Sequence, residues 1–93
     1  MRIVWTPASV NDLKDISHQI ERDRSLDTAN RVCRAIYDNI QILCQHPLSG
    51  RVGVENGTRE LVVSKLPYIV AYRLVDPASV QILHIWHGAQ FRS

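Results

Sequence analysis

The sequence lacks any long apolar run, which excludes one large class of proteins at the start. Its apolar runs are only a few residues long, such as Leu61, Val62 and Val63. A membrane-spanning helix needs roughly 20 consecutive apolar residues. The N-terminus also has no apolar core of the kind that signal peptides carry. We therefore predict no membrane association and a cytoplasmic location.

Cysteine is also scarce, and the two cysteines are poorly placed for a disulfide bond. Cys33 and Cys44 are predicted to lie on one helix, where eleven residues correspond to about 16 Å. A disulfide needs its two Cα atoms within about 7 Å of each other. We therefore expect two reduced and mostly buried thiols, which are typical of cytosolic proteins.

The composition indicates one small folded domain, residues 1–93. Hydrophobic residues make up 45% of the chain and charged residues 22%, a balance that favours a compact core over disorder. The net charge of +2 does not by itself predict nucleic-acid binding. The basic excess lies in residues 49–93, with five Lys or Arg against three Asp or Glu. If a polyanion or an acidic partner binds, we expect it to bind this half of the chain.

The first half of the chain predicts a strand and two helices. Residues 2–5 indicate a short strand, and residues 8–22 an amphipathic helix with apolar residues at helical spacing. Ser25 or Asp27 can cap a second helix. This helix should end near His46, because the residue before a proline is pushed out of helical geometry. The short connection predicts an antiparallel helical hairpin.

The second half predicts an irregular loop and three strands. Residues 47–57 contain three of the four glycines and indicate the loop. Residues 59–64, 68–75 and 80–86 are rich in β-branched and aromatic residues, and short turns join them into an antiparallel meander. The predicted fold is α+β in the order β-α-α-β-β-β. The hairpin covers one sheet face, and the other face is partly open.

The order of several short motifs resembles the RelE/ParE toxin superfamily over nearly the whole chain. None of them is diagnostic alone, but together they follow the family order. The motifs are Pro7-Ala8, Asp12-Leu13, Ile42-Leu43, His46-Pro47, Gly50-Arg51, Gly57-Thr58-Arg59-Glu60-Leu61, Tyr68-Ile69-Val70-Ala71-Tyr72-Arg73, Ile82-Leu83-His84-Ile85 and His87-Gly88-Ala89-Gln90. The resemblance implies a toxin of a type II toxin–antitoxin system, neutralised by a cognate antitoxin that covers it. A complex of two toxins and two antitoxins, binding operator DNA through the antitoxin, is the family-like expectation.

The resemblance leaves two activities open. ParE-like members poison DNA gyrase without nuclease chemistry, whereas RelE-like members cut messenger RNA on the ribosome. RelE-like nucleases commonly carry an arginine at the position of Ile69, and isoleucine cannot hold a phosphate. This departure favours the ParE branch. For the RelE alternative, His84 and His87 would be the catalytic acid and base. A third alternative is a domain that keeps antitoxin binding and has lost toxicity.

Eight residues are candidates for contact with the target or the antitoxin, and each also has a structural interpretation. They are Arg51, Arg59, Lys65, Tyr68, Tyr72, Arg73, Trp86 and Phe91. Arg59 can bind a partner carboxylate or brace the preceding loop through backbone carbonyls. Tyr68 and Tyr72 share a strand face and can stack on bases or pack internally. Trp86 can be an anchor or an interaction hot spot. We expect no cofactor and no metal.

Overall fold

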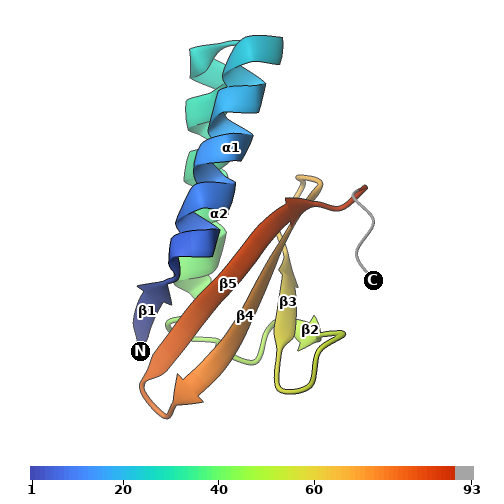
Figure 1. Cartoon of the computed structure of the whole chain (residues 1–93). Coiled ribbons are helices and arrows are strands. Elements are labelled where there is room, and N and C mark those ends of the chain that lie inside the picture. Colours follow the sequence, from blue (N-terminus) through green and yellow to red (C-terminus); the bar gives the residue numbers. More distant parts are fainter. Residues whose placement is uncertain (90–93) are drawn as a thin grey trace.

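The computed structural model describes residues 1–89, which form a helical hairpin beside a five-stranded sheet (Figure 1). The elements in chain order are β1 Arg2–Trp5, α1 Pro7–Asp23, α2 Leu26–Ile42, β2 Arg51–Val52, β3 Arg59–Val62, β4 Tyr68–Asp76 and β5 Ser79–His87. The predicted α+β class and element order are confirmed. The two-residue strand β2 is an addition, lying inside the segment predicted as a loop. The candidate residue Phe91 lies outside the described residues.

The two helices begin at side-chain caps and run side by side. Thr6 caps α1 by accepting a hydrogen bond from the backbone N–H of Ser9, and Ser25 caps α2 through the N–H of Thr28. No helix within residues 1–89 has the length and apolar character to cross a membrane.

The end of α2 differs from the prediction. The helix ends at Ile42 and not near His46. The N–H groups of Leu43, Cys44 and Gln45 each donate to the carbonyl three residues earlier, so the chain tightens before it reaches Pro47. Cys44 therefore lies beyond the helix that holds Cys33, and both thiols are free.

The sheet has the strand order β1-β5-β4-β3-β2. The strands β3, β4 and β5 form the predicted antiparallel meander, and β1 pairs with β5 in parallel. The pairing with β1 covers only Ser79–Ile82 of the longer β5. Beyond that point the edge of β5 faces α1, and this arrangement sets up the candidate site.

The core lies between the hairpin and the sheet. It consists of Ile36, Ile40, Leu43, Val63, Val70, Tyr72, Val80, Ile82 and Ile85. Alternate residues of β4, Val70 and Tyr72, point into it, as a strand with one covered face requires. In β5 the alternation from Val80 to Ile82 is interrupted by a register shift before Ile85. The same alternation leaves Ile69, Ala71 and Trp86 on the face turned away from the helices.

Candidate interaction site

The first turn of α1 is fixed directly to β5. The hydroxyl of Thr6 donates to the carbonyl of Ile82 at 2.7 Å, and its oxygen accepts from the N–H of Ser9 at 3.1 Å. Ser9 is fully buried and donates its own hydroxyl to the Thr6 carbonyl at 2.8 Å. The start of the helix therefore cannot shift along the strand without breaking these bonds.

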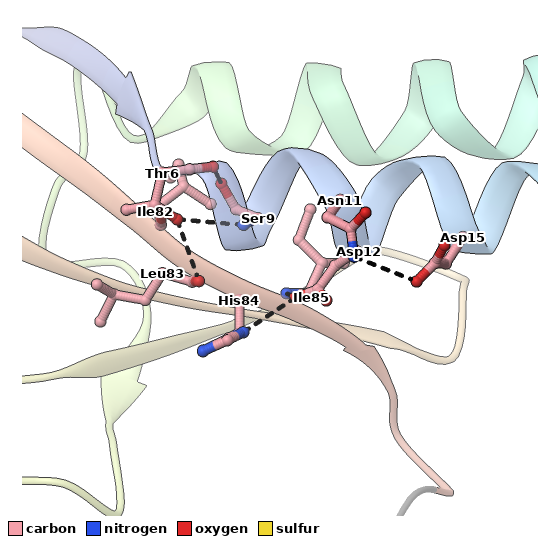
Figure 2. Close-up of polar contacts among 9 residues, drawn as sticks. All are labelled: Thr6, Ser9, Asn11, Asp12, Asp15, Ile82, Leu83, His84 and Ile85. Carbon is pink, nitrogen blue, oxygen red and sulfur yellow. Dashed lines mark hydrogen bonds and ion pairs between the residues drawn. The ribbon is translucent and has the colours of Figure 1, made fainter.

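One helical turn further on, Asp12 makes a second attachment to β5, as Figure 2 shows. Its Oδ2 atom accepts the backbone N–H of Ile85 at 3.0 Å and lies 3.1 Å from Nδ1 of His84. Because β1 ends at Trp5, this N–H faces the helix and not a neighbouring strand. The carboxylate takes the place of a strand carbonyl at the edge of β5.

The ribbons of α1 and β5 diverge toward the C-terminal end of α1 (Figure 1). Between them, beyond Asp12, lies a cleft of about 600 Å³. Asp12 and Asp23 are eleven residues apart, so the helix continues for about 17 Å past the attachment. The cleft, as we use the term below, is lined by Asp12, Asp15, Ile16, Gln19, Ile20, Asp23, Arg24, Tyr68, His84, Ile85, Trp86 and His87. The α1 residues in this set recur every three or four positions and therefore share one helix face.

A second hollow, of about 330 Å³, lies on the sheet face turned away from the helices. It is lined by Thr6, Ala8, Val54, Glu55, Thr58, Glu60, Ala71, Leu83, His84 and Trp86. Glu60 pairs with Ala71, which in turn pairs with His84, so the three form one row across β3, β4 and β5. The small Ala71 leaves the space between the other two open. His84 and Trp86 line both this hollow and the cleft.

The arginines predicted to contact a partner are engaged within the chain. Arg51 forms an ion pair with Glu60 at 3.0 Å. Arg73 donates from Nε to the side chain of Gln81 at 2.8 Å. These bonds direct the guanidinium groups of both arginines toward neighbouring strands.

Arg59 braces the loop before it, as one of its two interpretations predicted. Its Nη1 atom donates to the carbonyls of Gly50 at 2.8 Å and Leu48 at 3.3 Å. The hydroxyl of Tyr72 fixes the same loop by accepting from the N–H of Gly50 at 2.9 Å and donating to the carbonyl of Pro47 at 2.7 Å. Together they hold the segment that leads into β2.

Of the aromatic candidates within residues 1–89, Tyr72 and Trp86 are buried, and Tyr68 and Trp86 line the cleft. Tyr72 has no exposed surface and packs internally, which is one of its two interpretations, and burial raises the pKa of its phenol. Tyr68 lies in the cleft, with its ring edge-on to that of His87 at 5.4 Å. Trp86 is 9% exposed, which fits an anchor better than a protruding hot spot. Lys65 is exposed in the turn between β3 and β4, with a left-handed φ of 64°.

Sequence reasoning missed the acidic residues of the site. Asp12, Asp15 and Asp23 line the cleft, and Glu60 lines the second hollow. The spacing of the three aspartates along one helix was a usable signal, but nothing in the sequence showed which face would meet β5. Within residues 1–89, no three metal-binding side chains are grouped closely enough to hold an ion.

The chain is similar to known proteins both in sequence and in fold. A family model described as the ParE toxin of the type II toxin–antitoxin system parDE matches residues 3–91. A Sinorhizobium fredii protein named as a candidate toxin, Y4kP, is 39% identical over 89 residues, covering 96% of this chain and 90% of that protein. A solved structure titled as the chromosomal ParDE TA system from P. aeruginosa superposes with a TM-score of 0.84. It is 22% identical in sequence and covers 94% of this chain and 95% of its own.

Proposed function

The chain belongs to the ParE toxin family of type II toxin–antitoxin systems, and on that basis we propose that it inhibits DNA gyrase and is neutralised by a cognate antitoxin. It acts by binding and not by cutting nucleic acid. Its partners are gyrase and the antitoxin, and it reaches operator DNA only through the antitoxin. The proposed place of action is the cytoplasm.

The observation that carries this proposal is the pairing of Ile69 with Trp86. The two residues lie opposite each other on β4 and β5, on the face away from the helices. A ribonuclease of the related RelE kind would place an arginine at the position of Ile69. RNA cleavage needs cationic groups to stabilise the charge that develops on the phosphate. An isoleucine beside a tryptophan supplies none.

The contacts of three arginines on the strands of the sheet support the same conclusion. The guanidinium groups of Arg51, Arg59 and Arg73 are directed to Glu60, to loop carbonyls and to Gln81. A phosphate would have to compete with these internal acceptors. This arrangement suits a protein that acts through its surface shape better than one that performs phosphate chemistry.

Purified gyrase provides the test. We expect the protein to inhibit supercoiling and to accumulate cleaved DNA–gyrase complexes, and the antitoxin to reverse both effects. A control with gyrase and the antitoxin alone should show normal supercoiling. Unchanged supercoiling at a saturating amount of the protein would refute the proposal.

The alternative, a RelE-like nuclease that cuts messenger RNA on the ribosome, is favoured by one observation. His84 lies across Ala71 from Glu60, so a histidine and a carboxylate share one hollow on the sheet face away from the helices. Such a pair can act as general acid and base. Toeprinting on translated messages tests this alternative, which requires new cuts in the decoding site that disappear in the double variant His84→Ala/His87→Ala.

A further inference from the structure

The second hollow, on the sheet face turned away from the helices, has mostly apolar walls and a negative charge. Its apolar residues are Ala8, Val54, Ala71, Leu83 and Trp86. The carboxylates of Glu55 and Glu60 also line it, and among the described residues around it there is no lysine or arginine. Glu55 is exposed, whereas the side chain of Glu60 is only 14% exposed. Complementary charge therefore favours a cationic ligand with an apolar stem.

The carboxylate of Glu60 keeps one oxygen available to a ligand. Arg51 donates to its Oε1 atom from both Nε, at 3.1 Å, and Nη2, at 3.0 Å. Within residues 1–89, no hydrogen bond or ion pair reaches the other oxygen, Oε2. The two bonds from Arg51 also fix the orientation of the carboxylate. Oε2 is therefore an acceptor held in place for a donor from outside the chain.

His84, at the opposite end of the same row of residues, supplies a second acceptor. Oδ2 of Asp12 accepts the N–H of Ile85 and lies 3.1 Å from Nδ1 of His84. A carboxylate oxygen can only accept, so Nδ1 carries the proton in this contact. In the neutral ring Nε2 is then an acceptor. Figure 2 shows this second ring nitrogen on the side away from Asp12, and in the part of the chain that the structure describes it has no partner.

The two acceptors lie on either side of a small residue. Glu60, Ala71 and His84 form one row over β3, β4 and β5, and the methyl group of Ala71 leaves the middle of the row open. Neighbouring strands are about 4.8 Å apart, so the backbones of β3 and β5 are about 10 Å apart. A ligand between them must therefore offer N–H groups on two sides. Trp86, two residues from His84 on β5, adds an aromatic wall.

A guanidinium group meets these requirements. It is cationic and flat, it carries five N–H donors in a fixed fork, and it packs on aromatic rings, whereas the ammonium group of lysine is a compact point charge. We propose that the second hollow binds a guanidinium group, with Glu60 and His84 accepting from its two edges and Trp86 beside it. A volume of about 330 Å³ accommodates such a group with its aliphatic stem but not a helix or a strand. The group belongs either to a free molecule such as arginine or to an arginine side chain of a partner protein.

Titration of the complete protein with capped arginine, in which both ends are blocked as amides, tests the site by NMR. We expect shifts centred on Ala71 and His84. Capped citrulline has nearly the same shape without the charge, and it should bind at least about tenfold more weakly, because charge-assisted hydrogen bonds are the stronger kind. Nitrogen NMR of the His84 ring should show the proton on Nδ1.

Two variants test the hollow in different ways. Glu60→Gln removes the charge but keeps an oxygen that can accept from Arg51. Ala71→Val fills the middle of the row and changes no charge. Each should weaken the binding of capped arginine about tenfold or more. Glu21→Gln is the matched control, since it removes one negative charge from an exposed position on α1 outside the hollow, and it should bind like the unaltered protein.

Four results would each overturn the proposal. Capped arginine could leave Ala71 and His84 unshifted, or capped citrulline could bind equally well. Glu21→Gln could lose as much affinity as Glu60→Gln, or the proton of the His84 ring could lie on Nε2. Because these titrations contain no gyrase, they report on the hollow even if the unaltered protein leaves supercoiling unchanged.

Gyrase inhibition and antitoxin binding by Glu60→Gln and Ala71→Val identify the source of the guanidinium group. A loss in both variants in one of these assays, with Glu21→Gln unaffected, would assign the arginine to that protein. Unchanged results in both assays, together with weaker binding of capped arginine, would assign the site to a free molecule. Both outcomes support the site, and each names a different source.

Discussion

The carboxylate of Asp12 accepts the backbone N–H of Ile85 at 3.0 Å and so attaches α1 to the edge of β5 where β1 has ended. On the N-terminal side of Asp12 the helix is fixed against the sheet, and on its C-terminal side the two elements separate. The cleft therefore begins at this bond. Several consequences of this arrangement, and of the loop fixed by Tyr72, can be measured.

Replacing Asp12 with alanine should destabilise the fold. Ile85 is only 3% exposed, and its N–H would lose its acceptor. We expect a loss of about 1–3 kcal/mol in the free energy of unfolding, measured by urea denaturation. Asp12→Asn keeps an oxygen that can accept the N–H and should lose less. Asp15→Ala, in the same helix and exposed, should change stability by no more than about 0.5 kcal/mol. Equal losses in the Asp12→Ala and Asp15→Ala variants would contradict the role given to Asp12.

Removing the hydroxyl of Tyr72 should loosen the loop before β2. Tyr72→Phe leaves the N–H of Gly50 and the carbonyl of Pro47 without this partner. The expected cost is about 1–3 kcal/mol in the free energy of unfolding. Hydrogen exchange should show the loss of protection at Gly50 directly. The exposed Tyr37 provides the control, because Tyr37→Phe should leave stability and exchange nearly unchanged. Unaltered protection of Gly50 in Tyr72→Phe would rule out this role.

Stability should fall at alkaline pH. Burial raises the pKa of the Cys33 thiol above its ordinary 9.0, and burial raises the pKa of the Tyr68 and Tyr72 phenols above 10.0. The folded protein therefore holds these protons more tightly than the unfolded chain. This contribution to stability is complete below pH 9.0 and is lost as the pH rises through the raised pKa values of the folded state. Urea denaturation between pH 8 and pH 11 should show this decline, and Cys33→Ser/Tyr72→Phe should show a shallower one. A flat profile would contradict it.

The histidines of β5 should be dispensable for toxicity. If the protein acts on gyrase by binding, His84→Ala and His87→Ala should still arrest growth when induced in cells. His84→Ala removes the ring contact with Asp12, so protein levels must be compared by immunoblot. Loss of growth arrest in either variant, at normal protein levels, would favour the nuclease alternative.

The helices could be predicted from their apolar residues at helical spacing and, for α2, from the cap Ser25. The strands β4 and β5 could be predicted because they are rich in β-branched and aromatic residues. The end of α2 could not be predicted as well, because the chain leaves the helix four residues before the expected end near His46. The strand β2 has only two residues and depends on pairing with β3, which no local pattern reveals.

The candidate site was only partly predictable, because its contacts join residues far apart in the chain. Asp12 meets Ile85 across 73 positions. The position of His84 near the C-terminus marks it as a candidate in the sequence. Nothing near His84 in the sequence indicates that the carboxylate of Asp12 lies beside it. Arg59 was assigned two interpretations, and only the structure shows which backbone carbonyls it reaches. For Tyr72 the sequence leaves base stacking and internal packing open, and only the structure shows that the side chain is fully buried.

Inducing the protein in growing cells and following DNA damage and translation together is the most direct test of gyrase as the target. A gyrase toxin should cause a rapid DNA-damage response while translation is still intact, and production of the antitoxin alongside should rescue growth. Immediate arrest of translation with cut messages, before any DNA damage, would contradict it and leave the nuclease alternative in its place.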